Sequence, residues 1–348
     1  MSALSMHVAP HERLRPLAWR RMAWVIWRQH RAALAGLAAL VGGLGLVLGL
    51  VGLQLHHAYA AAAACRPAGS PICADLVHRF NGMDSLFANG FVLQAVPALI
   101  GAFVGAPLLA RELESGTYRY AWTQGFGRSR WTLAKLVGLA AAVVVAAAVL
   151  SMLLSWYYRP YFAAGNQGKF LNEASPLASG LFDLRGLALV AWTLAAFSIG
   201  ALLGMLIRRV VPAIVAALVA YVGLALFAAT YIRQHYRAPL VASIPNVPGS
   251  DFVIRHWWTK GATFAFTRAP IGLLERICPP PPAGAREGNF DKAGYVAHCL
   301  TVHGYRQWIS YQPATRFWSF QLIETGWLLA LSASLIAATV WLVRRRAT

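Results

Sequence analysis

Long apolar runs alternate with short polar segments along the chain, and this alternation predicts a helical membrane protein. Six runs reach the length of about 20 residues that a helix needs to cross the hydrocarbon of a bilayer. Alanine, leucine and valine fill them, and their interiors are almost free of charge. Pro97 and Pro107 in the second run are compatible with a membrane helix whose neighbours satisfy the freed carbonyls. The predicted spans cover residues 33–54, 91–110, 136–157, 185–207, 210–231 and 322–343.

The composition agrees with this pattern. Of the 348 residues, 58% are hydrophobic and only 12% are charged, whereas a soluble domain carries about 25% charged residues. The formal net charge of +19 does not indicate a nucleic-acid partner. The basic residues flank apolar spans, where lipid head groups and insertion topology account for them, and no nucleic-acid-binding motif accompanies them. We therefore expect an all-α integral membrane protein whose partner is the lipid bilayer and not a nucleic acid.

Arginine and lysine in the short connecting segments predict the orientation. The N-terminal segment, the segment between the second and third spans, the turn between the fourth and fifth spans and the C-terminal tail are all Arg-rich. Six spans place these four segments on one side, and the positive-inside rule makes that side cytoplasmic. The first apolar run has full span length and no cleavage site before it, so it reads as an uncleaved anchor. Both termini are expected in the cytoplasm.

The outer segment before the last span is too long for a plain connector and is rich in tryptophan and tyrosine. It predicts either a small folded cap at the membrane interface, where these residues are enriched, or a lid over a substrate path. The expected parts of the chain are a cytoplasmic or interfacial N-terminal helix (1–32), five spans (33–231) with a cytoplasmic loop (111–135), an extracytoplasmic loop domain (232–321), and the sixth span with a basic tail (322–348).

All four cysteines fall in loops that the charge pattern places outside the cell. Disulfides persist in such an oxidising compartment and are rare in the cytoplasm. The sequence CRPAGSPIC closes a small proline- and glycine-containing loop, and the second pair brackets an irregular proline-rich region. The predicted disulfides are Cys65–Cys73 and Cys278–Cys299.

Catalytic and metal-binding motifs are absent from the sequence. A rival metal site at His298, Cys299 and His303 does not match a known zinc spacing. There is no P-loop, no HExxH and no GxSxG motif, so we expect no catalytic, cofactor or metal site. No acidic residue lies in the middle of a predicted span. This argues against a proton- or sodium-driven transporter and against a membrane-embedded hydrolase.

Three GxxxG pairs lie inside predicted spans. Glycines at this spacing allow helices to approach closely. Because glycine is common in such spans, the pairs predict helix packing and give only a weak indication of dimerisation. The pairs are Gly45/Gly49, Gly101/Gly105 and Gly200/Gly204.

The polar segment between the second and third spans predicts a short amphipathic helix. Gly116 ends the preceding helix, and Thr117 is a suitable N-cap. Tyr118, Trp122 and Phe126 then recur every four residues and share one helix face. That face suits an aromatic anchor in the head-group layer, and it equally suits a docking surface for a soluble partner. Periodicity does not separate these two interpretations.

This segment, GAPLLARELESGTYRYAWTQGFGRSRWTLAK, resembles the first cytoplasmic loop of type-2 ABC exporter permeases, notably an actinobacterial branch. WVIWRQHRAAL near the N-terminus and YQPATRFWSFQLIETGW before the last span resemble two further landmarks of that branch. The three stretches span nearly the whole chain in order. Leu113 and Tyr120 depart conservatively from the branch, which often has Phe and Leu there.

The resemblance implies a permease without its own nucleotide site, and hence a chain that is not an enzyme. Two such subunits, here expected as a homodimer, pair with two separate ATP-binding subunits that hold ATP and magnesium. The stretch Trp24–Arg31 would be an interfacial connecting helix, and the short helix after the second span would be the coupling element. The expected coupling residues are Glu112, Glu114, Gly116, Thr117, Trp122, Thr123, Arg128 and Arg130, with Tyr118 and Phe126 on the aromatic face.

We therefore expect a permease in a bacterial cytoplasmic membrane that exports a hydrophobic or amphipathic substrate, since the spans carry few polar side chains. The alternative is a non-transporting scaffold or sensor whose outer loop binds a ligand. A channel is a further alternative, although the polar or charged pore rings usual in channels are not evident.

Overall fold

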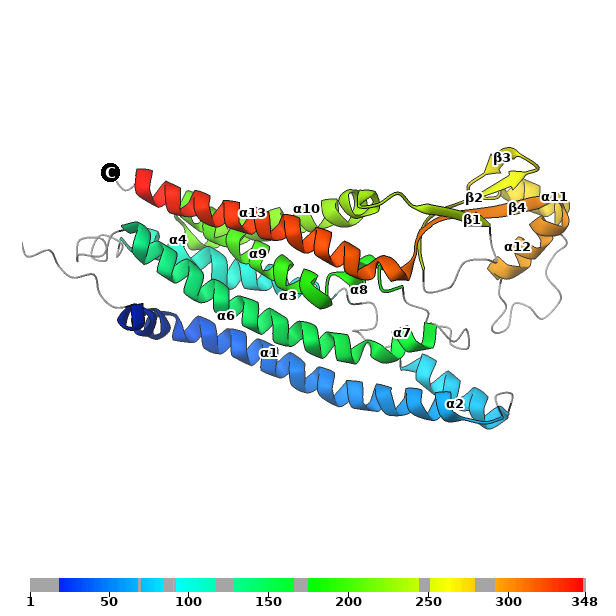
Figure 1. Cartoon of the computed structure of the whole chain (residues 1–348), viewed down its shortest axis with the longest axis horizontal. Coiled ribbons are helices and arrows are strands. Elements are labelled where there is room, and N and C mark those ends of the chain that lie inside the picture. The colour runs from blue at the N-terminus through cyan, green and yellow to red at the C-terminus, as the bar shows by residue number, and fades with distance from the viewer. Residues whose placement is uncertain are drawn as a thin grey trace, which may run out of the picture.

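The computed structural model describes residues 19–67, 70–83, 90, 92–116, 128–165, 175–243, 251–278 and 292–346. Six of its helical segments are long and apolar enough to cross a membrane, in the six regions that the sequence predicts. The described ends of the chain, at Trp19 and Arg346, lie at the same end of the elongated bundle (Figure 1). The expected all-helical membrane region is therefore confirmed.

The first helix, α1 (Trp19–Ala64), has 46 residues. At about 1.5 Å per residue it is roughly 69 Å long, more than twice the hydrocarbon thickness of about 30 Å. The Trp24–Arg31 stretch belongs to this helix, and its first turns are viewed nearly end-on in Figure 1, at an angle to the rest. At its other end α1 continues ten residues beyond the predicted span, which ended at residue 54.

This outer extension of α1 packs with two short helices, α2 (Pro71–Gly82) and α7 (Arg159–Gly165). A disulfide joins Cys65 to Cys73 across the turn into α2. Phe80 of α2 is fully buried, and its ring lies 5.7 Å from that of Tyr59 and 5.9 Å from that of Tyr161. The aromatic cluster and the disulfide hold α2 and α7 against the end of α1, an arrangement that hydropathy does not predict.

The second span is built from three consecutive segments: α3 (Ala95–Ile100), a π-helical turn η1 (Gly101–Gly105) and α4 (Ala106–Ser115). Pro107 stands in the first turn of α4, just after η1, and a local π-type adjustment of this kind allows a membrane helix to accommodate a proline. The third span is α6 (Arg128–Tyr157). The sixth is α13 (Phe317–Arg346), which begins in the outer segment and returns to the end where α1 starts (Figure 1).

The fourth span, α9 (Gly186–Ile207), lies at the centre of the bundle and contacts the second, third, fifth and sixth spans. Two of the predicted GxxxG pairs meet there. A Cβ atom on Gly200 would stand 2.2 Å from the carbonyl oxygen of Gly101, and one on Gly105 would stand 2.5 Å from that of Phe197. Only glycine permits backbones to approach this closely. These pairs therefore pack helices within one chain, as the sequence predicts.

The fifth span is a helical rod of three consecutive segments: α10 (Val210–Phe227), a second π-helical turn η2 (Ala228–Ile232) and η3 (Arg233–His235). It packs against α4 and α9 through a cluster of small residues that includes Ala106, Ala110, Ala213 and Ala217.

The segment between η3 and α13, which we call the outer unit after its predicted location, folds into a four-stranded antiparallel sheet of order β1-β4-β2-β3, with two helices. This unit lies beyond the end of the bundle in Figure 1. The expected all-α class covers the membrane region, and the sheet is an addition that it did not include. The elements are β1 (Leu240–Ser243), β2 (Phe252–Lys260), β3 (Thr263–Phe266), α11 (Ile271–Ile277), α12 (Lys292–Val302) and β4 (Tyr305–Gln312).

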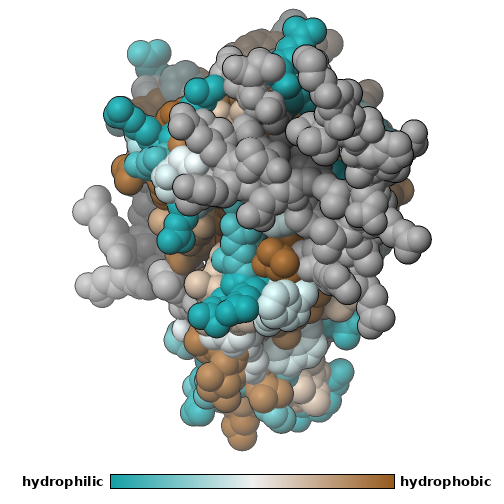
Figure 2. Space-filling view, turned by 90° about the vertical axis from the view of Figure 1, so that its left-hand side faces the viewer, coloured by the Kyte–Doolittle hydropathy of each residue, from teal (hydrophilic) through white to brown (hydrophobic). Residues whose placement is uncertain are grey.

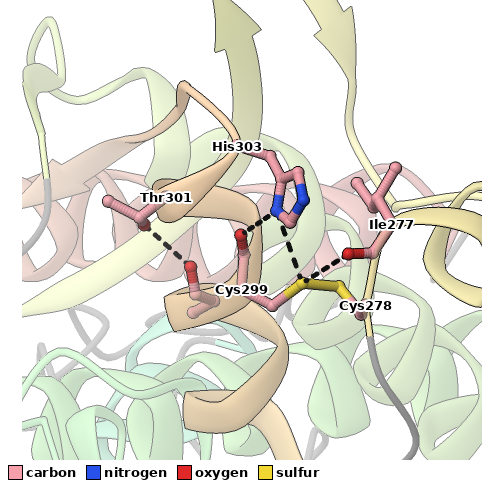
Figure 3. The surroundings of a disulfide bond; sticks show 6 residues. Ile277, Cys278, Cys299, Thr301 and His303 are labelled. Atoms are coloured by element: carbon pink, nitrogen blue, oxygen red, sulfur yellow. Dashed lines mark hydrogen bonds between the residues drawn. A yellow bond between two sulfur atoms is a disulfide. The ribbon is translucent and has the colours of Figure 1, made fainter.

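The core of the outer unit lies between the sheet and its helices, around Trp258, Leu300 and Tyr305. A disulfide joins Cys278, at the end of α11, to Cys299 in α12 (Figure 3). Both disulfides occur in the pairing that the sequence predicts. The Nδ1 atom of His303 lies 3.9 Å from the sulfur of Cys299, and none of the described residues form a cluster able to hold a metal ion.

Candidate coupling site at the Arg-rich end

The end of the second span is fastened to three other spans. The α4 helix runs past the predicted end of the span and stops at Gly116, whose φ of 72° is the left-handed conformation that glycine adopts readily. Glu112 and Glu114 lie in the last turn before this stop. Both carboxylates contact other helices, so they fix the position at which the following segment begins. We call residues 112–116 the root of the loop.

Glu112 connects the first, second and third spans. Its Oε1 accepts a hydrogen bond of 2.7 Å from Nε2 of Gln29 in α1, and the same oxygen pairs with the ammonium of Lys135 in α6. The Lys135 side chain is 0% exposed and that of Glu112 is 16% exposed. The ammonium also lies 4.5 Å from the ring centroid of Trp131, a favourable cation–π geometry.

Glu114 connects the second span to the fifth. Its Oε2 accepts a hydrogen bond of 2.9 Å from the backbone N–H of Val210, the first residue of α10. The carboxylate therefore satisfies a free N–H at a helix N-terminus and lies at the positive end of the helix dipole. Arg208 ends the preceding helix with φ of 60°, which allows α9 and α10 to reverse direction within a short turn.

Figure 2 views this end of the molecule and shows hydrophilic side chains of described residues gathered on it. Arg344 of α13 adds a further connection, because its Nε donates to the hydroxyl of Ser129 at the start of α6 over 2.8 Å. The last span is thereby tied to the third at the same end.

The structure thus brings part of the predicted coupling set together and leaves part undescribed. Glu112, Glu114 and Gly116 form the root of the loop, and Arg130 lies exposed in the first turn of α6, which Arg128 begins. Gln29 and Lys135, the partners of Glu112, were not predicted from the sequence. Five predicted residues, Thr117, Tyr118, Trp122, Thr123 and Phe126, lie outside the described residues.

A buried charge cluster that the sequence pattern did not predict lies at the opposite end of the bundle. Glu324 of α13 and Arg233 of η3 lie within candidate spans, near their outer ends. The Arg233 guanidinium donates to both oxygens of Glu324, at 3.1 and 2.8 Å, and pairs with Asp183 after α8 (Ser179–Phe182). No acidic residue was expected mid-span. The carboxylates of Glu324 and Asp183 are accommodated here because both lie against the Arg233 guanidinium, of which only Nη1 has no hydrogen-bond partner among the described residues.

Two further donors complete this cluster. The indole N–H of Trp192 donates to Glu324 over 2.8 Å, and the hydroxyl of Tyr236 donates to its other oxygen over 3.1 Å. Burial raises the pKa of Asp183 above the usual range of aspartate, against the opposing attraction of Arg233. The cluster joins the fourth, fifth and sixth spans at the end of the bundle that is next to the outer unit.

A family model for ABC-2 membrane transporter related proteins matches residues 34–233, more than half of the chain. The match covers the first five spans and therefore includes both carboxylates at the root of the loop. No curated protein matches the chain, and no solved structure matches it.

Proposed function

Because the chain belongs to the ABC-2 membrane transporter related family, we propose that it is the permease subunit of an ATP-driven exporter for a hydrophobic or amphipathic substrate. A separate ATP-binding subunit supplies the energy, and two copies of this chain form the membrane part in a bacterial cytoplasmic membrane. Both termini and the segment between α4 and α6 then face the cytoplasm, as their arginine content favours.

The observation that carries this proposal is the attachment of α4 at its end. A loop that transmits force must not move independently of the spans. Glu112 holds this end of α4 to α1 and α6, and Glu114 holds it to α10. A push on the segment after Gly116 therefore acts on four spans together. A loop that served only as a lipid anchor would need none of these connections.

The test is copurification with the ATP-binding subunit, followed by substrate-stimulated ATP hydrolysis in reconstituted membranes. Trp122→Ala removes the centre of the proposed aromatic docking face, and a buried aromatic residue at an interface contributes about 2 kcal/mol or more. We expect the affinity for the partner to fall by roughly thirtyfold, since each 1.4 kcal/mol changes the dissociation constant tenfold. Less of the ATP-binding subunit should then be recovered. A Glu114→Ala/Arg128→Ala variant should also uncouple hydrolysis from export.

The matched control is Trp341→Ala, which removes a half-exposed tryptophan of α13 near the same end of the chain. It should bind the partner as the unaltered protein does. Normal recovery and normal stimulation in both Trp122→Ala and the double variant would assign the segment to membrane anchoring alone. Failure of the unaltered chain to recover any ATP-binding subunit would favour the non-transporting scaffold or sensor.

A further inference from the structure

A cavity of about 530 Å³ lies among α1, the second span and α6, next to the root of the loop. This volume is within the range of small-molecule sites. Its walls are divided by polarity. The end near the loop carries His30, Arg111 and Glu112, whereas Phe103, Leu108 and Leu139 line the part deeper in the bundle.

The polar end has groups that lack a partner. The buried Nε2 atom of His30 has no hydrogen-bond partner in the described part of the chain, and it is a donor in the tautomer that carries its hydrogen there. Glu112 is already engaged by Lys135 and Gln29. The exposed Arg111 side chain makes no ion pair with a described residue, so its charge is available to an anion that enters the cavity. A guanidinium and an imidazole N–H together suit the oxygens of a phosphate or a carboxylate.

From its polar end to its apolar end, the cavity is about as deep as one lipid leaflet. Arg111 and Phe103 are eight residues apart along the second span, or roughly 12 Å of helix, compared with about 15 Å for half of the hydrocarbon. Phe103 is 60% exposed on the side of the bundle, so the cavity opens toward lipid. The wall there includes the π-helical turn η1, a feature that is frequent at functional sites.

We propose that this cavity binds an anionic phospholipid of the leaflet at the Arg-rich end, with its phosphate on Arg111 and His30 and an acyl chain beside Phe103 and Leu139. The head group then lies near the Glu112–Lys135 pair, in which the ammonium already compensates the carboxylate charge that would otherwise repel a phosphate. This inference concerns binding to the chain alone, so it stands or falls separately from the proposed transport function.

The experiment is native mass spectrometry of the full chain in detergent, titrated with phosphatidylglycerol or with phosphatidylcholine. We expect one tightly bound phosphatidylglycerol per chain and weaker phosphatidylcholine binding. Arg111→Gln removes a charge-assisted hydrogen bond and should weaken phosphatidylglycerol binding by about tenfold, whereas Arg111→Lys should restore part of it. Arg209→Gln, which removes another exposed arginine at this end, is the control and should leave binding unchanged.

A second variant tests the cavity and not only its charge. Ala33→Phe fills the space with an aromatic ring and should abolish tight binding, while Ala39→Phe, on an exposed position of the same helix, should not. Equal binding of the two lipids, equal losses in Arg111→Gln and Arg209→Gln, or unchanged binding in Ala33→Phe would each overturn the proposal. Displacement of the lipid by an equal concentration of inorganic phosphate would show a plain anion site and refute the role of the acyl chain.

Discussion

Removal of the Glu112 carboxylate is the most informative perturbation of the coupling site, because it separates an ion pair that is buried on one side only. The Lys135 side chain is 0% exposed. In Glu112→Ala it remains buried, but its counter-ion is gone. An uncompensated buried charge destabilises a fold by about 3–5 kcal/mol. Lys135 retains the Trp131 ring, so we place the cost near the lower limit, at about 3 kcal/mol.

The reverse change has a smaller expected cost. In Lys135→Met the remaining carboxylate is 16% exposed and keeps its hydrogen bond from Gln29, so water and the amide partly compensate it. We expect a loss of about 1–2 kcal/mol, the usual penalty of an incompletely paired polar group. In the double variant no buried charge remains, and its stability should exceed that of Glu112→Ala. This inequality is the signature of a coupled pair.

The assay is reversible unfolding of the chain in mixed detergent micelles, monitored by tryptophan fluorescence, in all four variants of the cycle. The control is Asp75→Ala, because its ion pair with Arg79 on α2 has side chains that are 59% and 73% exposed and should contribute less than about 0.5 kcal/mol. If the two single changes add within about 0.5 kcal/mol, or Asp75→Ala costs as much as Glu112→Ala, the burial argument is wrong.

Three further changes test other contacts. Gly200→Ala places a methyl group 2.2 Å from the Gly101 carbonyl and should cost at least about 1–3 kcal/mol; Gly223→Ala, with no atom within 4 Å, should cost nothing in the same unfolding assay. Glu324→Gln should destabilise by about 3 kcal/mol or more, whereas Asp183→Asn should cost only about 1 kcal/mol, because the Asp183 side chain is 19% exposed and Glu324 still balances the charge of Arg233. Glu114→Ala should speed amide exchange in the first turn of α10 by a factor that corresponds to about 1 kcal/mol, with α9 unchanged.

Hydropathy predicted all six spans because each is a long apolar run, whether its side chains face lipid or, as in the central α9, mostly other helices. This property is local in the sequence. Hydropathy did not predict how far a helix continues outside the membrane. After residue 54 the chain reads LHHAYAAAAAC with two adjacent histidines, which lowers the hydropathy although alanine still favours helix. His56 in this stretch stacks on Trp156 of α6 at 4.7 Å, a tertiary contact that a sequence window does not contain.

The strands of the outer unit were missed for a related reason. A strand with one buried face should alternate apolar and polar residues, but FVIRHWWTK has two adjacent tryptophans and its register shifts twice. Trp258 is buried under α12, while Trp257 lies opposite Trp308 on the other face of the sheet. Both faces of the strand therefore carry aromatic residues, and the period of two disappears from the sequence.

The polar contacts between spans were the least accessible part of the site. The hydrogen-bonded residues Gln29 and Glu112 are 83 positions apart, and the ion-paired residues Arg233 and Glu324 are 91 apart. Each of these side chains alone reads as a polar or charged group at the end of a span, which the interface tolerates. Only the three-dimensional packing shows that Arg233 and Glu324 meet inside the bundle. The resemblance found the two carboxylates of the loop root by position, but it gave no information about their partners within the chain.

The fifth span connects the two polar sites of the molecule. This span begins at Val210, where Glu114 accepts the first N–H, and its last turn carries Arg233, which is paired with Glu324 and Asp183. Between these ends its contacts with α4 and α9 are made largely by alanine and other apolar residues, and such surfaces can slide with little loss of specific bonding. The fifth span has polar contacts at both ends and apolar packing between them, so we expect it to move as one body. Displacement of α4 by a partner at one end would therefore reach the base of the outer unit at the other.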